Sequence, residues 1–248
     1  MNVAIILAGG TGNRMGANVP KQFLRIMDKP ILAYTLEIFQ KNSNIDAIAI
    51  VCHKDWIDET RTICSDYEIT KLKWIFRGGR TFQESVMNGV YSLKDELDDS
   101  DIVVISFGVS PMTSDEIIDD SIKVCLCNGS NAIAAEDIVL CTCIKDNEYS
   151  TTQGILRENL KGFSNPWTFN FGELYSAYRE AEGKGILGIL EPHTTSLYLA
   201  LGKRLYFSKT NSRNIKITTP EDLDIFEGQL LLKEKRMKLG MTKENNND

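Results

Sequence analysis

Short apolar runs that alternate with helix-like stretches constrain the fold of this 248-residue chain more than any other feature. Near-continuous apolar strands of this kind are typical of a mainly parallel sheet that is covered by helices on both faces. The sequence therefore predicts a three-layer, Rossmann-like α/β fold. Right-handed crossovers bring the carboxyl ends of such strands to one edge, where we expect a ligand site. The predicted strands are residues 3–7, 47–52, 72–76, 101–106 and 205–208, and the predicted helices are residues 31–41, 55–67, 82–97, 114–127 and 171–181.

The middle of the chain departs from this alternation. Residues 138–144 and 151–156 are β-like and flank a polar turn, so we expect a β-hairpin arm over residues 138–157. An isolated hairpin is marginally stable in water. We therefore expect the arm to pack on a partner subunit and form a homodimer. The alternative is a hairpin that folds back on its own domain.

The carboxyl-terminal part predicts one more helix and a tail. Thr219-Pro220-Glu221-Asp222 is a good helix start, with proline in the first turn and acidic residues beside it. The last residues are polar. We expect a single domain over residues 1–235 and a polar, disordered tail over residues 236–248.

The formal net charge of −6 argues against a general nucleic-acid binder. Any basic site must be a local island, which suits a small anionic substrate better than a polymer. The first apolar run is far shorter than a membrane span and lacks a basic region before it, so we expect no targeting signal. We expect a cytoplasmic protein with no membrane association.

Six cysteines include two C-x-C pairs, which raise the alternative of a zinc site. Cys125 and Cys127 fall in a predicted helix and point to opposite sides. Cys141 and Cys143 fall in a predicted strand and share a face. We expect buried or half-buried reduced thiols rather than a metal site.

A glycine-rich turn follows the first predicted strand. Residues 7–16 read LAGGTGNRMG, and residues 20–24 read PKQFL. Glycines let the backbone approach a ligand closely, and their N–H groups can hold anionic oxygens. Arg14 and Lys21 add two cations beside this turn, which suits a triphosphate.

Two other nucleotide motifs fit poorly. A dinucleotide-binding turn needs a third glycine where this chain has Met15, and an acid after the second strand where it has Cys52-His53-Lys54. A P-loop needs Gly-Lys followed by Ser or Thr, and the sequence has none.

The pattern LAGG-x-G-x-RMG…PKQFL resembles the cytidylyltransferase family that includes 2-C-methyl-erythritol 4-phosphate cytidylyltransferase and ribitol-5-phosphate cytidylyltransferase. Further segments similar to that family follow in the right order, so the resemblance spans about residues 3–225. These segments are Gly78-Gly79 through Ser85-Val86, Arg157-Glu158-Asn159-Leu160, and NIKITTPEDL at residues 214–223.

The resemblance implies a nucleotidyltransferase fold and a CTP-dependent transfer of CMP to a small phosphorylated alcohol, with release of pyrophosphate. Such products are precursors of isoprenoids or cell-surface polysaccharides. The resemblance implies that Arg14, Lys21 and Lys216 contact the phosphates and carry the catalysis. It implies Mg²⁺ as a cofactor with CTP, although the metal ligands stay unknown. It also implies a nucleotide pocket lined by Ala8, Gly9, Gly10, Gly12, Gly79 and Ser85.

For the acceptor, the resemblance implies contacts from Arg157 and Thr218. Arg157, at the root of the arm, would reach the acceptor phosphate in the neighbouring subunit's site. Thr218 would lie beside the same phosphate.

The acceptor side departs from the family pattern. A His-Asp-x-x-Arg-Pro segment is replaced by residues 106–111, so the acid's position is Phe107 and the arginine's is Ser110; another family arginine falls at Phe82, with Arg80 nearby. Residues 164–167 and 191–195 also differ from the family pattern. We interpret this as a transferase with an altered acceptor, and the alternative is a non-catalytic nucleotide-binding or scaffold homologue. Candidates for the altered pocket are His193, Thr194, Trp167, and Glu136 or Asp137, with Asp137 also a candidate to hold the metal.

Overall fold

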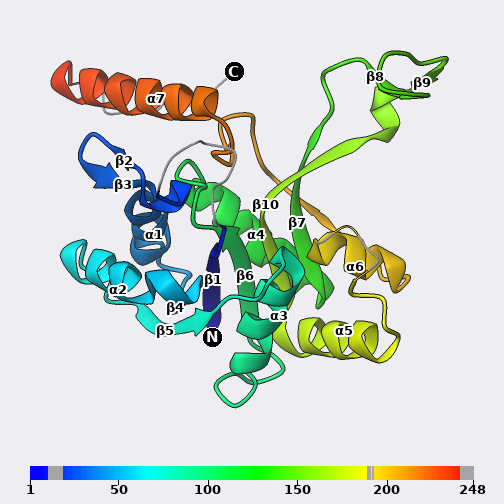
Figure 1. Ribbon diagram of the computed structural model, residues 1–248, viewed down its shortest axis with the longest axis horizontal. Helices are drawn as coiled ribbons and strands as arrows, with labels where there is room; N and C mark the ends of the chain where they lie inside the picture. Colours follow the sequence, from blue (N-terminus) through cyan, green and yellow to red (C-terminus); the bar gives the residue numbers. More distant parts are fainter. Residues whose placement is uncertain (11–18, 189–190, 192, 241–248) are drawn as a thin grey trace.

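The computed structural model describes residues 1–10, 19–188, 191 and 193–240. Its centre is a seven-stranded sheet in the order β11-β7-β10-β6-β1-β4-β5 (Figure 1). Neighbouring strands run parallel except at β10, which is antiparallel to both β6 and β7. The strands are β1 (Asn2–Ala8), β4 (Ala47–Cys52), β5 (Leu72–Arg77), β6 (Ile102–Phe107), β7 (Asn131–Asp137), β10 (Lys161–Asn170) and β11 (Phe207–Ser208).

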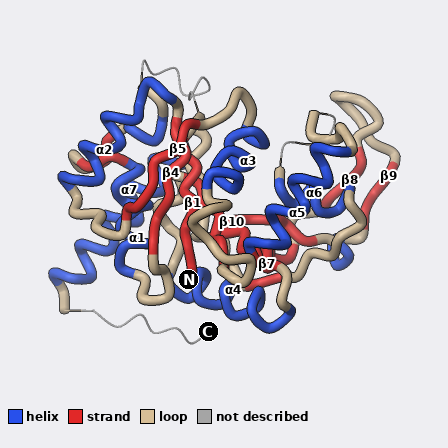
Figure 2. Tube along the Cα trace, turned by 90° about the horizontal axis from the view of Figure 1, so that it is seen from below, coloured by secondary structure: helices blue, strands red, loops and turns tan. Residues whose placement is uncertain are grey.

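Helices cover both faces of the sheet (Figures 1 and 2). Strand β1 shows the division, because Ile5 and Leu7 pack in the core cluster that contains Val86 of α3, whereas Ile6 packs in the cluster that contains Leu36 of α1. The first face carries α3 (Phe82–Ser92), α5 (Phe171–Gly183) and α6 (Thr194–Ala200), and the second carries α1 (Ile31–Lys41), α2 (Ile57–Asp66) and α4 (Asp115–Asn128). The predicted three-layer, mainly parallel fold is confirmed.

Several predicted bounds were wrong. The helix expected over residues 55–67 is divided into the 3-10 helix η3 (Lys54–Trp56) and α2, and the helix expected to reach residue 97 ends at Ser92. The final helix α7 (Pro220–Lys238) extends three residues into the segment that we expected to be a polar tail. The first described residues of that segment are therefore helical.

Strands β7 and β10, the helix α6 and the short pair β2 (Arg25–Ile26) and β3 (Lys29–Pro30) were not predicted. Strand β10 contains Pro166, which cannot donate a hydrogen bond to a neighbouring strand and usually marks an edge or a bulge. Here the pairing with β7 shifts register between Phe163 and Trp167. Pro166 lies within this irregular stretch, where the regular pattern of hydrogen bonds to β7 is interrupted.

The predicted arm is confirmed as an antiparallel hairpin, although its strands are short. Strand β8 (Thr142–Ile144) pairs with β9 (Gln153–Ile155), and the hairpin projects beyond β7 and β10 at one end of the sheet (Figure 1). It does not fold back on its own domain. The arm carries apolar side chains in water, with Leu140 74% and Tyr149 89% exposed.

The cysteines divide into two groups. Cys52, Cys64 and Cys125 are buried, and burial raises the pKa of both Cys64 and Cys125 to about 12, so these thiols stay protonated. The expectation of buried or half-buried thiols was wrong for the other three, Cys127, Cys141 and Cys143, which are exposed. Within the described residues, no group of three or more His, Cys, Asp or Glu side chains is placed to hold a metal ion.

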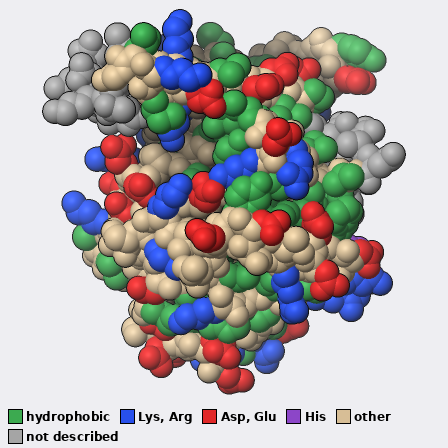
Figure 3. All heavy atoms as spheres, turned by 90° about the vertical axis from the view of Figure 1, so that its left-hand side faces the viewer, with side chains coloured by type: hydrophobic (Ala, Val, Ile, Leu, Met, Phe, Trp, Pro, Cys, Tyr) green, Lys and Arg blue, Asp and Glu red, His purple; other side chains and the backbone are tan. Residues whose placement is uncertain are grey.

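Charges of both signs are interspersed on the face of the molecule shown in Figure 3. Among the helices of the described residues, none combines the length and hydropathy needed to cross a membrane. The expected lack of nucleic-acid binding stays a prediction.

Helix α3 packs so closely on the sheet that one helix position has no room for a side chain. A Cβ atom at Gly89 would lie 2.8 Å from Val51 Cγ2 and 3.6 Å from Ile5 Cγ2. We predict that Gly89→Ala lowers the free energy of unfolding by about 1–3 kcal/mol, because overpacking displaces the helix. Gly183→Ala at the end of α5 is the control, since the added methyl group would have no atom within 4 Å apart from its chain neighbours and the backbone of its own helix. Urea denaturation measures both variants, and equal stabilities would contradict this account of the packing.

Candidate functional site

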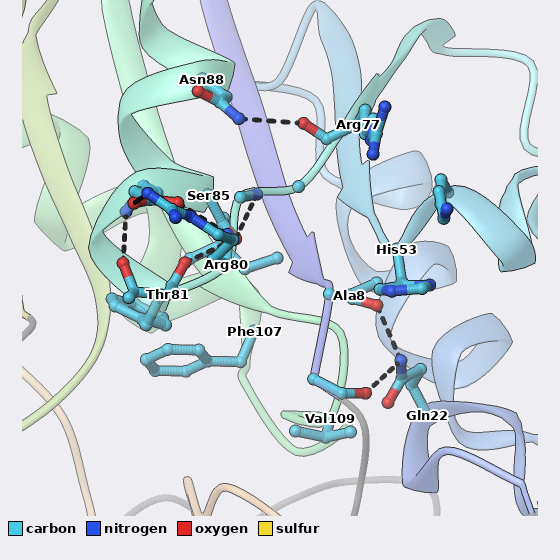
Figure 4. A pocket seen from close by; sticks show the side chains of 18 of the residues that line it. Ala8, Gln22, His53, Arg77, Arg80, Thr81, Ser85, Asn88, Phe107 and Val109 are labelled. Carbon is cyan, nitrogen blue, oxygen red and sulfur yellow. Dashed lines mark hydrogen bonds and ion pairs between the residues drawn. The ribbon is translucent and has the colours of Figure 1, made fainter.

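A cavity of about 840 Å³ opens at the edge of the sheet where β1, β4, β5 and β6 end. This volume lies within the range of about 300–1,000 Å³ that is usual for small-molecule sites. The position is the edge at which parallel sheets bind ligands. Figure 4 shows the side chains that converge there from several elements. Its described walls are residues 7–10, 21–22, 53–54, 77–82, 84–85, 88, 107, 109 and 216.

The first wall is the start of the glycine-rich turn. The buried Gln22 side chain holds it in place, because Nε2 donates hydrogen bonds to the carbonyl oxygens of Ala8 (2.7 Å) and Gly10 (3.0 Å) (Figure 4). Lys21 precedes Gln22 in the 3-10 helix η2 (Lys21–Phe23) and lines the same cavity. The turn and the lysine are therefore fixed to each other through their neighbouring residue.

The second wall is the loop between β5 and α3. The Gly79 N–H donates to Ser85 Oγ (3.0 Å), and the Ser85 hydroxyl donates to the Thr81 carbonyl oxygen (2.9 Å). A Cβ atom at Gly79 would lie 2.2 Å from Glu84 Cβ, so this position has no space for a side chain. Ser85 thus holds the loop as well as lining the cavity.

The cavity is strongly basic. Its described lining contains one carboxylate, Glu84, which accepts hydrogen bonds from the Arg80 backbone N–H (2.7 Å) and the Arg80 guanidinium (3.3 Å). Both contacts lower the pKa of Glu84, so it stays ionised at neutral pH. A surplus of cations in a concave site favours a polyanionic ligand. The basic lining residues are Lys21, Lys54, Arg77, Arg80 and Lys216.

Arg77 and Lys54 were not among the predicted site residues. Arg77 is the last residue of β5, and Lys54 comes two residues after β4. Both residues could have been predicted, because each lies at or just after the carboxyl end of a predicted strand, where ligands bind in parallel sheets. Gln22 was not predicted as a site residue either, although it lies inside the PKQFL motif.

The structure places most of the predicted site residues together. Arg14 and Gly12 lie outside the described residues. The predicted residues that line the cavity are Ala8, Gly9, Gly10, Lys21, Gly79, Ser85 and Lys216.

Two predicted acceptor contacts do not line the cavity of their own chain. Thr218 Oγ1 lies 2.8 Å from Asp222 Oδ2 at the start of α7. Arg157, in the 3-10 helix η4 (Arg157–Asn159), donates from Nη1 to the Val139 carbonyl oxygen (2.8 Å) at the root of the arm. Arg157 therefore lies at the root of the arm, outside the described lining of the cavity.

Phe107 stands at the end of β6, where the family pattern has an acid, and belongs to an aromatic cluster of Phe82, Phe107, Trp167 and His193. Ring centroids lie 5.7 Å apart between Phe82 and Phe107, 5.5 Å between Phe107 and Trp167, and 5.8 Å between Trp167 and His193. Phe82 and Phe107 line the cavity, and the other two rings pack behind them. This side of the cavity is apolar.

The residues proposed for an altered acceptor pocket do not line the cavity. Trp167 is buried and donates from Nε1 to the Ser164 carbonyl oxygen (2.7 Å). The buried Thr194 hydroxyl lies 3.0 Å from the Tyr178 hydroxyl. Asp137 forms an ion pair with Lys161 (2.7 Å), and Glu136 and His193 are likewise absent from the described lining.

A buried polar network explains two of the departures from the family pattern. Ser110 Oγ donates to Asn165 Oδ1 (3.0 Å), and Asn165 Nδ2 donates to Ser106 Oγ (3.2 Å) and Thr113 Oγ1 (3.1 Å). Thr113 Oγ1 donates to Asn214 Oδ1 (2.9 Å). Ser106 and Ser110 therefore lie inside the protein and connect β6 to the segment that carries Lys216.

That segment is attached to the loop after β6 by its backbone as well. The N–H of the buried Ile217 donates to the Val109 carbonyl oxygen (2.8 Å). Lys216 is thereby held at the cavity, with Nζ 3.8 Å from the centre of the Phe107 ring.

The described side chains of this site do not fit a resident divalent metal. Mg²⁺ takes oxygen ligands, usually from one or two carboxylates together with substrate phosphates and water. Glu84 is the single carboxylate in the described lining and is engaged by Arg80. Asp137, the other candidate, is paired with Lys161 away from the cavity.

A mainly parallel sheet with a basic cavity beside the start of a glycine-rich turn is typical of an α/β domain that binds nucleotides. The family model described as "IspD: 2-C-methyl-D-erythritol 4-phosphate cytidylyltransferase" matches residues 2–232. The chain belongs to this cytidylyltransferase family, which confirms the resemblance identified in the sequence.

Curated relatives cover most of the chain. The ribitol-5-phosphate cytidylyltransferase of Lacticaseibacillus paracasei is 37% identical over 94% of this chain and 100% of its own length. The 2-C-methyl-D-erythritol 4-phosphate cytidylyltransferase of Clostridium novyi is 35% identical over 92% of this chain and 96% of its own length. The 4-diphosphocytidyl-2C-methyl-D-erythritol synthase of Anaerococcus prevotii has a similar fold, with a TM-score of 0.77 at 23% identity over 94% of this chain and 96% of that chain.

The buried polar network predicts a stability defect. We expect Asn214→Ala to lower the free energy of unfolding by about 1–3 kcal/mol, because it leaves buried partners without hydrogen bonds. Ser212→Ala, at an exposed position in the same segment, is the control. Urea denaturation with tryptophan fluorescence measures both, and an unchanged midpoint for Asn214→Ala would show that the network does not stabilise the fold.

Proposed function

We propose that this chain transfers the cytidylyl group of CTP to the phosphate of a small phosphorylated alcohol and releases pyrophosphate. The observation that carries the proposal is that Lys21 and Lys216, which lie far apart in the sequence, line one cavity with the backbone of Gly9 and Gly10. Membership of the cytidylyltransferase family supports the same reaction.

In the proposed reaction, an oxygen of the acceptor phosphate attacks the α-phosphorus of CTP in line with the departing group. A new P–O bond forms as the bond between the α-phosphorus and the bridging oxygen breaks, and pyrophosphate leaves with the electron pair. The acceptor phosphate is already ionised at neutral pH, so the step needs no general base. Catalysis then consists of positioning and charge stabilisation, for which we propose Lys21, Lys216 and Arg14.

The proposed place of the nucleotide is between the two glycine-containing walls. Gly79 has no room for a side chain, and Ser85 Oγ and the backbone of Gly9 lie close by, since a Cβ atom on Gly9 would lie 3.6 Å from Ser85 Oγ. We propose that these residues, with Ala8 and Gly10, form the pyrimidine pocket, and that its small size excludes purines.

We propose a polyol phosphate as acceptor, with ribitol 5-phosphate the first candidate and 2-C-methyl-D-erythritol 4-phosphate the second. Support comes from the relatives named for these two substrates. The aromatic wall formed by Phe82 and Phe107 favours an acceptor that presents C–H groups to that side.

We propose that the divalent cation, Mg²⁺, enters bound to the triphosphate of CTP. The single engaged carboxylate in the described lining supports this source over a resident metal. We also propose that the protein works in the cytoplasm, where its nucleotide and sugar-phosphate substrates are found, without binding membranes or nucleic acid.

We propose that the arm, residues 138–157, mediates a homodimer. Its exposed apolar side chains, including Val139 (79%) and Leu156 (66%), support burial against a second copy. Arg157 at the root of the arm and Thr218 would then contact the acceptor phosphate in a site shared between two chains.

The reaction predicts a large loss of activity in two lysine variants. We expect Lys21→Met and Lys216→Met each to lower kcat/KM by about a hundred-fold or more, because each removes a charge that stabilises the transition state. Lys233→Met, at an exposed position on α7, is the control. The measurement is pyrophosphate release from CTP, Mg²⁺ and each polyol phosphate. Full activity of both variants would contradict the assignment, and CTP binding without turnover of any acceptor would support the non-catalytic homologue.

A shared site predicts complementation between two inactive variants. A mixed dimer of Arg157→Ala and Lys216→Met chains contains one site with both residues intact if Arg157 acts in the partner's site. We expect mixing after partial unfolding to restore up to about a quarter of the wild-type activity, since half of the dimers are mixed and each has one intact site. Activity that stays at the level of the separate variants would mean that Arg157 does not act across the dimer.

A further inference from the structure

Lys216 lies against an aromatic ring at the wall of the cavity. Its ammonium nitrogen lies 3.8 Å from the centre of the Phe107 ring, well within the range of about 6 Å in which a cation is attracted to an aromatic face. An acid occupies this position in the family pattern. Where that pattern has an acid, this chain therefore has a ring beside the lysine.

The ring itself has little freedom to move. Phe107 is 8% exposed and contacts the rings of Phe82 and Trp167. The Trp167 indole N–H is anchored on the Ser164 carbonyl oxygen. The ring that faces Lys216 is thus backed by packed and hydrogen-bonded side chains.

The backbone of Lys216 is equally restrained. Ile217 is hydrogen-bonded to Val109, two residues after Phe107, and Asn214 belongs to the buried polar network. The lysine and the ring are therefore held by the same loop after β6. The face of the Phe107 ring then restrains the flexible side chain of Lys216.

We propose that Phe107 is a positioning residue that holds the Lys216 ammonium where the α-phosphate of CTP binds. This inference rests on the proposed transfer from CTP. An aromatic face attracts the ammonium through its quadrupole and carries no net negative charge. A carboxylate at position 107 would offset the positive charge of the lysine, whereas the ring orients the ammonium group and adds no negative charge of its own.

Graded fluorination of Phe107 tests the proposal, because fluorine weakens the negative face of the ring and changes its shape little. Mono-, di- and trifluorinated phenylalanine at position 107 are expected to lower kcat/KM stepwise, to a total loss of about two- to thirty-fold. The same series in the Lys216→Met background is expected to be flat. The same series at Phe169, a buried ring on β10, is the control. A flat series with Lys216 present, or an equal slope without it, would overturn the proposal.

A second measurement does not depend on the reaction. Isotope-labelled dimethyl-lysine NMR reports the surroundings of each amine, and the Lys216→Arg variant assigns the Lys216 signal. The ring current of Phe107 is expected to shift that signal upfield, and Phe107→Leu is expected to return it to the position of exposed lysines. A Lys216 signal that Phe107→Leu does not move would overturn the proposal whatever the substrate is. Absence of CTP turnover together with the upfield shift would instead contradict the proposed function alone.

Discussion

The hydrogen bond from the Ile217 N–H to the Val109 carbonyl oxygen attaches the segment before α7 to the loop at the edge of the sheet. This attachment brings Lys216 to the cavity that the residues at the end of β1 also line, although the two lie far apart in the sequence. The buried hydrogen bonds that link Asn165, Thr113 and Asn214 hold the same segment in place from inside the protein. The basic cavity therefore depends on contacts made several residues away from the groups that line it.

The sequence predicted the parts of the fold that strong local patterns specify. The strand at residues 47–52 was found because a continuous apolar run indicates a strand that is buried on both faces, and the helix at residues 31–41 was found because its amphipathic pattern agrees with its buried face. Strand β7 was missed because its sequence NAIAAED is rich in alanine and ends in two acids, which is a poor strand pattern. Strand β10 was missed because Pro166 and Gly162 read as a loop, and tertiary pairing overrides that preference.

The site was predictable where motif residues lie on the cavity itself, as with Lys21, Gly79 and Lys216. The sequence did not reveal which polar side chains are buried and hydrogen-bonded inside the protein instead of lining the cavity. Thr194 and Trp167 looked like candidates for a new acceptor pocket, but each satisfies a hydrogen bond inside the core. No local pattern reveals that Ser106 and Ser110 take part in the buried network, because that depends on Asn165 approaching them from a neighbouring strand.

The Gln22 side chain has a consequence for the polarity of the glycine-rich turn. Its amide nitrogen donates hydrogen bonds to the carbonyl oxygens of Ala8 and Gly10, which carry partial negative charges that would repel a phosphate. The negative ends of two peptide dipoles are thus neutralised within the protein. A glutamate of the same shape would place an acceptor against two acceptors and add a negative charge beside the basic lining residues, so the Gln22 amide supports the preference for anions that those cations create.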